Sequence, residues 1–242
     1  MRSQGARAAG TPRSAWLAPL LLLACVALCS AGLLQSANAL AAELNPTPDS
    51  AYPLDAIERV GTLRGPSSCH PKQLVFYRGT RLKLEPPSLV FEPFVARLKR
   101  FEATVAEIGI QVYGRAPSQM LHVGTYVCRT VEPQQWHLSE HAFGNAIDVT
   151  AFRFPPQASV AADAASRALP RRLKGAFTLS VLADYYPARP ATETSDRHQR
   201  FFALLNRALR ERALFRTAIG PADARHRSHL HLDMAPWPYL KL

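Results

Sequence analysis

Apolar residues recur at helical spacing in two stretches of the chain. From Pro93 to Glu107, and again from Asp196 to Arg212, apolar positions follow one another at steps of three and four. Such spacing places the apolar side chains on one face of an amphipathic helix. We therefore expect one helix in each stretch. The first is expected to stop at Gly109, because glycine often follows the last turn of a helix.

Shorter apolar runs predict strands. They are bounded by glycine, proline or polar turn residues, as strands commonly are. The expected strands are Ile110–Tyr113, Leu121–Cys128, Thr178–Leu182 and His229–Met234. Residues 155–176 are rich in alanine, proline and arginine, and their weak periodicity predicts a surface excursion. The expected fold class is α+β, a loop-rich domain with a small antiparallel sheet and flanking helices.

The first 42 residues are expected to be a targeting segment. Arg2, Arg7 and Arg13 precede an apolar stretch at residues 15–34, and no acidic residue lies in this segment. A basic start followed by an apolar stretch and small residues is typical of an export signal. Because the apolar stretch is about twenty residues long, an uncleaved anchor in the inner membrane is the alternative. Either way, the rest of the chain is expected to be periplasmic or secreted, touching the membrane only through this segment.

The remainder is expected to be a tether followed by one domain. Residues 43–61 contain three prolines and few apolar anchors, which predicts a flexible tether. Residues 62–242 hold the predicted helices and strands, and their length suits one domain with a sizeable core. The net charge of the chain is +11, and only three of its basic residues lie in the leader. A basic domain favours an anionic neighbourhood such as a wall polymer, a membrane surface or nucleic acid.

Candidate chemistry concentrates where histidines cluster near the end of the chain. His229, His231 and Asp233 alternate with leucines, so on a strand these three polar residues share one face. Upstream, His141 and Asp148 flank a turn of small residues, which lets a loop histidine and a strand carboxylate approach one ion. Two histidines and one carboxylate leave a position open on tetrahedral zinc, as in catalytic zinc sites. We therefore expect a metal site.

These motifs resemble a known family. The matching segments are Gly124-x-Tyr126-x-Cys128-Arg129, then Ser139-x-His141-x-x-Gly144-x-Ala146-x-Asp148, and later His226-x-x-His229-x-His231-Leu232-Asp233. They are similar to the bacterial extensin-like C-terminal domain family, over about Cys69 to Trp237. They also resemble the zinc peptidase superfamily of lysostaphin, the D-Ala-D-Ala metallopeptidases and the hedgehog signalling domain. The resemblance implies a fold like that of the hedgehog domain and the D-Ala-D-Ala peptidases.

The resemblance also implies roles for single residues. The metal ligands would be His141, Asp148 and His231, holding one zinc ion per chain. Many D-Ala-D-Ala peptidases have a glutamate base three residues before the last ligand, where this chain has Ser228. The murein endopeptidase branch instead has a histidine five residues before that ligand, which is His226 here.

The remaining expected roles concern the proton and the substrate. His226 and His229 would be the acid/base pair, and Asp233 would support the site without binding metal. Arg129 would hold a substrate carboxylate, with a surface salt bridge as the alternative. Ser139 would hydrogen-bond substrate, with an ordinary turn serine as the alternative.

Two cysteines lie outside the leader. They are Cys69 and Cys128, and export favours a disulfide between them. The alternative is a pair of buried free thiols. Neither cysteine has a partner at the spacing of a structural zinc site.

The expected function follows from the resemblance. It is an exported zinc metallopeptidase that hydrolyses peptide bonds of peptidoglycan, in the stem or the cross-link, through zinc-activated water. Peptidoglycan or its peptides would be the partner. The alternative is a non-catalytic, zinc-containing module that binds the cell wall, as the hedgehog precedent suggests. Nucleic acid is not expected, because the protein is exported and no basic strip interleaves with aromatic residues.

Overall fold

The computed structural model describes residues 52–57, 59, 69, 73–131, 137–157, 169–186 and 190–242. The predicted targeting segment 1–42 lies outside the described residues, as do residues 158–168 of the predicted surface excursion. In the described part of the chain, every helix is too short or too polar to span a lipid bilayer.

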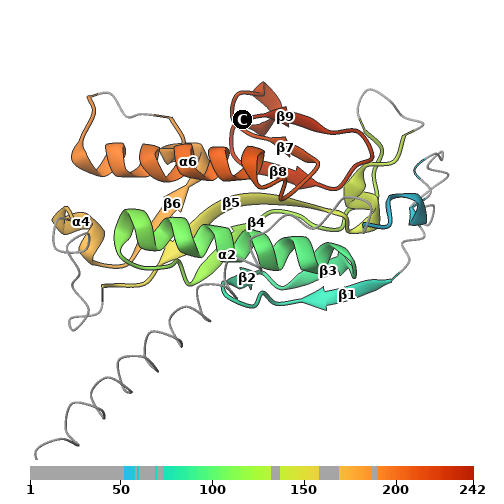
Figure 1. Cartoon of the computed structure of the whole chain (residues 1–242), viewed down its shortest axis with the longest axis horizontal. Helices are drawn as coiled ribbons and strands as arrows, with labels where there is room; N and C mark the ends of the chain where they lie inside the picture. Colours follow the sequence, from blue (N-terminus) through green and yellow to red (C-terminus); the bar gives the residue numbers. More distant parts are fainter. Residues whose placement is uncertain are drawn as a thin grey trace, which may run out of the picture. The chain divides into compact units, whose positions relative to one another are not determined.

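A mixed sheet runs through the described part of the chain (Figure 1). Seven of the described strands form it, in the order β2-β4-β5-β8-β7-β9, with β6 also paired to β5. The strands are β2 (Lys83–Glu85), β4 (Gln119–His122), β5 (Ala146–Phe154), β6 (Phe177–Ser180), β7 (Thr217–Ile219), β8 (Leu230–Asp233) and β9 (Tyr239–Lys241). The predicted α+β class is confirmed. However, β2–β4 and β7–β9 are parallel pairs, so the sheet is not purely antiparallel.

A separate two-stranded sheet and several short helices complete the described elements. This sheet pairs β1 (Leu74–Tyr77) with β3 (Ser88–Phe91) in antiparallel fashion. The short α-helices are α4 (Arg171–Lys174) and α5 (Val181–Asp184), and the 3-10 helices are η2 (Leu54–Ala56), η3 (Glu140–Phe143) and η4 (Ala224–His226). The last two 3-10 helices carry histidines of the predicted site.

Two long helices lie side by side along the sheet (Figure 1). They are α2 (Phe94–Tyr113) and α6 (Glu193–Glu211). Phe101 of α2 and Phe201 of α6 both contact Phe152 of β5, with ring centroids 6.4 and 5.5 Å away. All three side chains are fully buried. Burying large aromatic side chains is the main stabilising contribution to such a core.

The first long helix continues beyond its predicted end. Gly109 lies inside α2, and the helix ends at Gly114, which adopts a left-handed conformation with φ of 68°. The predicted stop at Gly109 and the predicted strand Ile110–Tyr113 are therefore wrong. Gly109 serves close packing instead: a Cβ there would lie 2.9 Å from Pro117 Cδ and 3.1 Å from Phe154 Cε1. Helix propensity alone does not show that contact.

Replacing Gly109 by alanine is expected to destabilise the protein. Alanine is a better helix former than glycine by about 1 kcal/mol, but the added methyl group would overpack the contact with Pro117, at about 1–3 kcal/mol. We expect a lower free energy of unfolding, measured by denaturant titration. Gly175→Ala is the matched control, because its Cβ would meet no atom within 4 Å. A Gly109→Ala variant as stable as the wild type would contradict this account.

One predicted strand was mostly wrong and another ends early, whereas two other elements are confirmed. The strand expected over Leu121–Cys128 is β4, which ends at His122, and residues 123–128 form a loop. The strand expected over Thr178–Leu182 ends at Ser180, because the Ser180 hydroxyl accepts from the Ala183 N–H and caps α5. The helix expected over Asp196–Arg212 and the strand expected over His229–Met234 are confirmed as α6 and β8.

The described part of the predicted tether is packed. Tyr52, Ile57 and Arg59 are each less than a tenth exposed. The ring of Tyr52 contacts Phe91 of β3 edge-on, with centroids 6.5 Å apart. These residues therefore belong to the domain, and its packed part begins before the expected position 62.

Candidate metal centre

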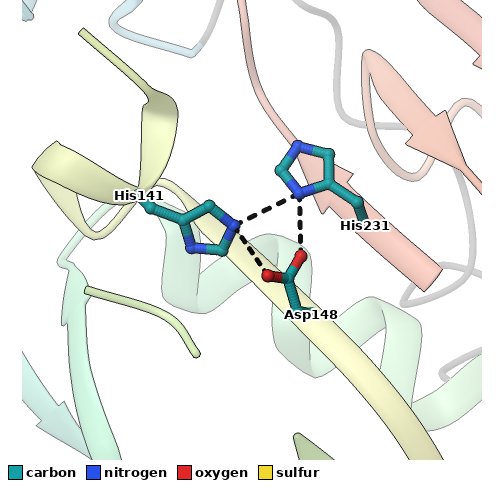
Figure 2. A group of neighbouring side chains, drawn as sticks. All are labelled: His141, Asp148 and His231. Atoms are coloured by element: carbon teal, nitrogen blue, oxygen red, sulfur yellow. Dashed lines mark hydrogen bonds and ion pairs between the residues drawn. The ribbon is translucent and has the colours of Figure 1, made fainter. Parts of the chain in front are cut away.

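Three side chains from distant parts of the sequence meet at one point (Figure 2). Nε2 of His141 lies 3.2 Å from Asp148 Oδ2 and 3.2 Å from His231 Nδ1. Nδ1 of His231 lies 2.8 Å from Asp148 Oδ1. One ligand atom of each residue lies within 4.8 Å of the others. The structure thus brings together the three residues predicted as metal ligands.

Strand pairing sets two of these positions. In the register of β5 and β8, Asp148 lies directly opposite His231. On β8 the flanking Leu230 and Leu232 are fully buried. Alternation along a strand therefore points His231 to the other face. The predicted division of this strand into a polar and an apolar face is confirmed.

A β-bulge sets the direction of Asp148. The pairing of β4 with β5 skips Thr150, which is therefore an extra residue on β5. With strict alternation, Asp148 would share a face with Phe152 and Phe154, which pack into the helix-covered core. The extra residue reverses the alternation, so Val149 is fully buried while Asp148 faces the same side as His231. Bulges often re-aim side chains next to functional sites.

A short 3-10 turn presents His141. The Ser139 hydroxyl accepts from the His141 N–H at 3.3 Å, which caps the start of η3. Gly144 ends the turn in a left-handed conformation with φ of 68°. A Cβ at Gly144 would lie 2.9 Å from the backbone nitrogen of Phe91. Glycine at position 144 is therefore required by the positive φ and by the close approach of β3.

Each histidine of the group is held through its other ring nitrogen. Nδ1 of His141 lies 3.2 Å from the carbonyl oxygen of Thr125. Because a carbonyl only accepts, this nitrogen carries a proton and leaves Nε2 free as a donor atom to a cation. Nε2 of His231 lies 2.8 Å from Asp233 Oδ2, which leaves Nδ1 toward Asp148. Metal-binding histidines are usually oriented by such outer hydrogen bonds.

The ionisation of Asp148 and that of His231 depend on each other. Burial raises the pKa of Asp148, but hydrogen bonds from His141 and His231 outweigh it and hold that pKa well below its usual range. Burial lowers the pKa of His231, but hydrogen bonds to Asp148 and Asp233 outweigh it and raise the pKa to about 9. The Asp148 carboxylate is therefore ionised and His231 is protonated at neutral pH. A metal ion that binds His231 Nδ1 must displace the proton on that nitrogen. Two nitrogens and one carboxylate oxygen, all partly or fully shielded from water, form a donor set that suits zinc.

The two histidines predicted as an acid/base pair lie beside this group. Nε2 of His229 is 3.7 Å from Asp148 Oδ1. The ring of His226 lies 5.0 Å from that of His229 and 5.7 Å from that of His231. Burial lowers the pKa of His229, which favours its neutral form. Both side chains are thus within reach of a group reacting at the three-residue centre.

A cleft of about 440 Å³ opens next to the centre. His231, Asp233 and Ser139 line its polar part, and Ile219, Trp237 and Tyr239 line much of its apolar part. Clefts of this size with a few polar groups are typical small-ligand sites. Of the three centre residues, His231 alone lines this cleft, together with its partner Asp233, and neither His226 nor His229 lines it.

The two residues predicted to bind substrate lie near this cleft. Arg129 has an exposed side chain, and its carbonyl accepts from the Ser139 N–H at 3.0 Å. Ser139 is 6% exposed, and its hydroxyl caps the turn that holds His141. The turn role that was the alternative for Ser139 is therefore present. Binding of substrate by either residue stays a prediction.

One buried polar network was not predicted from the sequence. Glu140, next to the first histidine, pairs with Arg59 at 2.5 Å and accepts from the Asn145 side-chain amide. Asn145 in turn accepts from the Tyr52 hydroxyl. The network ties the start of the domain to the turn that carries His141. The sequence signal for this network was a single acidic residue, Glu140, within a motif of small residues. Its partner Arg59 lies 81 residues away, so the pairing could not be predicted.

The disulfide between Cys69 and Cys128 is present, with a Cα–Cα distance of 5.7 Å. Cys128 follows Val127, whose N–H donates to the His141 carbonyl at 3.0 Å. The same loop contains Thr125, the acceptor for the His141 ring. The disulfide therefore fastens the loop against which the first histidine is held.

Replacing both cysteines by serine is expected to lower the free energy of unfolding by about 2–4 kcal/mol, since the bridge constrains the unfolded chain. Any metal ion held at the candidate centre should also bind more weakly, because the loop beside His141 is no longer fixed by the disulfide. Thermal unfolding and competition with a chelator would measure the two effects. Intact-mass measurement without reductant should show two hydrogens fewer than the reduced protein. Equal stability of variant and wild type would refute the stabilising role.

The described residues thus form an α+β domain that carries a His–Asp–His group suited to a divalent metal. Residues 54–184 match the family model described as Extensin-like protein C-terminus. This is more than half of the chain, and the chain therefore belongs to the extensin-like C-terminal domain family. Comparisons with curated proteins and with solved structures found no match.

The matched range differs from the extent expected from the motifs. It begins before Cys69 and ends before the His226–Asp233 segment. His141 and Asp148 lie inside it, whereas His231 lies outside. The pairing of β5 with β8 is what joins the two parts of the candidate centre.

Proposed function

We propose that the protein is an exported zinc metallopeptidase that hydrolyses peptide bonds of peptidoglycan. The observation that carries this proposal is the convergence of His141, Asp148 and His231, with the outer hydrogen bonds that orient both histidines. The proposal places the chain within the superfamily of lysostaphin, the D-Ala-D-Ala peptidases and the hedgehog domain. The likeness of its motifs to that superfamily supports this placement.

In this proposal the centre holds one zinc ion per chain, through Nε2 of His141, Nδ1 of His231 and a carboxylate oxygen of Asp148. Zinc bound there would acidify a water molecule and polarise the carbonyl of the scissile amide. Asp233 and the Thr125 carbonyl keep both imidazole rings in the orientation and tautomer that this requires. Asp233 thus supports the site, in keeping with its expected role.

His226 and His229 move the proton in the proposed reaction. Both histidines lie beside the centre. The lowered pKa of His229 favours its neutral form, which can accept a proton. One of them would take the proton of the attacking water at a ring nitrogen and pass it to the leaving amine. A histidine suits this task because its ordinary pKa lies near neutral pH.

The cleft beside His231 would receive the wall peptide. Its apolar side can cover the aliphatic part of a peptide stem, and the exposed Arg129 would approach a carboxylate of the stem. The net charge of +11 favours association with an anionic wall. The predicted leader at residues 1–42 would deliver the domain to the periplasm or the exterior.

Metal content and cleavage test the proposal together. The full chain would be purified with detergent, its zinc measured by mass spectrometry, and the protein incubated with whole peptidoglycan. We expect about one zinc per chain and new peptide ends among the released fragments. Zinc without cleavage, where a related peptidase cuts the same wall preparation, would favour the non-catalytic binding module. Absence of bound metal after zinc loading would overturn the site itself.

A further inference from the structure

A carboxylate outside the predicted site holds one of its histidines. Asp223 immediately precedes η4, and its Oδ1 accepts from the Arg225 N–H at 3.0 Å. The same oxygen lies 3.0 Å from His226 Nδ1. Its other oxygen, Oδ2, accepts from Lys241 Nζ of β9 at 2.9 Å. One carboxylate therefore joins the 3-10 turn, the histidine and the last strand.

These contacts determine the tautomer of His226. The hydrogen bonds from His226, Lys241 and the Arg225 backbone hold the pKa of Asp223 well below its usual range, so the carboxylate is ionised. An ionised carboxylate only accepts hydrogen bonds. Nδ1 of His226 must therefore carry the proton, and in the neutral ring Nε2 is left with a lone pair. That free nitrogen is the atom a general base needs.

The His226 ring lies close enough to the candidate centre for its free nitrogen to act on a group that reacts there. The His226 ring lies 5.0 Å from that of His229 and 5.7 Å from that of His231, which belongs to the candidate centre. Its side chain is 18% exposed, so water reaches it only in part. A base held this way loses little orientational freedom when substrate binds, and fixed orientation is a large part of catalytic efficiency.

We propose that Asp223 is a positioning residue that holds His226 as the Nδ1–H tautomer, with Nε2 free to accept the proton of the attacking water. This inference rests on the proposed peptidase function. The role of Lys241 is different: it neutralises the second oxygen of Asp223 from the neighbouring strand and does not touch the histidine.

The test separates positioning from simple structural support. Asp223→Ala should lower kcat about 100-fold, the usual contribution of a general base, while KM for a wall peptide and the zinc content stay near wild type. Lys241→Met is the matched control, because it removes the other partner of the same carboxylate and leaves the bond to His226. Turnover of Lys241→Met should stay within about threefold of wild type. An equal loss of turnover in both variants would overturn the proposal.

A double-variant comparison tests whether Asp223 acts through His226. Residues that act as a unit are strongly non-additive. In a His226→Gln background, Asp223→Ala should therefore lower kcat by no more than about threefold. A full 100-fold loss in that background would show that Asp223 acts elsewhere, and the proposal would fail.

A spectroscopic measurement of the His226 tautomer tests the positioning role of Asp223 independently of turnover. Long-range nitrogen–proton NMR of the zinc-loaded full chain should show the His226 proton on Nδ1, with the signals assigned by their loss in His226→Gln. In Asp223→Ala, and in the near-isosteric Asp223→Leu should the alanine variant fold poorly, no acceptor faces Nδ1, so the proton should shift at least partly to Nε2. An unchanged tautomer in both would overturn the proposal. If the wild type cuts no wall peptide, the peptidase function fails and this spectrum alone decides the positioning role.

Discussion

Under the proposed function, replacement of His231 or Asp148 by alanine is expected to abolish zinc binding and peptidoglycan cleavage together. Either change removes one of three donor atoms that lie within 4.8 Å of one another. A metal contributes several kcal/mol to transition-state stabilisation in such sites, so we expect a loss of activity of at least about 1000-fold. Zinc content and fragment analysis of digested peptidoglycan would measure the two effects.

Two further variants serve as controls for this prediction. Asp233→Asn changes the acceptor at His231 Nε2 without removing a donor atom of the centre, so zinc affinity should fall by about 10–100-fold and not vanish. His226→Gln should retain full zinc content while turnover falls. An Asp148→Ala protein that keeps stoichiometric zinc would show that the metal, if present, is held elsewhere.

Replacement of Arg59 by methionine is expected to cause the largest loss of stability. The Arg59–Glu140 ion pair is buried, with side chains 7% and 6% exposed. Removing the guanidinium leaves the Glu140 carboxylate buried without its cationic partner, which typically costs about 3–5 kcal/mol. The carbonyls of Leu54 and Ile57 lose a donor as well. Denaturant titration would give the difference in free energy of unfolding.

The structure offers a matched pair of controls for Arg59. Arg207→Met removes an exposed ion pair with Glu211, at 69% and 59% side-chain exposure, and should change stability by less than about 1 kcal/mol. The double variant Arg59→Met/Glu140→Gln removes the charge that would be stranded, and should recover part of the loss. If the single and double variants were equally unstable, the loss would come from packing and not from the uncompensated charge.

Local patterns were sufficient for the two long helices, for β8 and for a metal site, but not for most of the short strands. The helix α6 and the strand β8 follow from the spacing of apolar residues. Helices repeat every three to four residues and strands every two, so a short stretch of sequence distinguishes them. Strand alternation and a small-residue turn predicted a metal site among the histidines and carboxylates of the two motifs, and the resemblance of the motifs selected His141, Asp148 and His231 as its ligands. Each of these signals lies within about ten consecutive residues.

Long-range contacts account for the predictions that were wrong or missing. Gly109 signalled a helix end in the sequence, but its closeness to Pro117 and Phe154 shows a packing role inside α2. Residues 52–59 have the composition of a tether, yet Arg59 is paired with a glutamate 81 positions later. The composition of residues 52–59 does not show which distant residues pack against them, and these contacts bury the segment.

The sequence by itself determined the α+β class and the two long helices, favoured the cysteine pair, and through the resemblance of its motifs singled out the three residues that form the candidate centre. Only the tertiary structure decided which nitrogen of each histidine faces Asp148, because Thr125 and Asp233 fix the ring orientation through contacts across strands and loops. It also decided that Asp148 faces His231, through one extra residue at Thr150. Hydrogen bonds depend on position and direction within a few tenths of an ångström, and only the folded chain sets those.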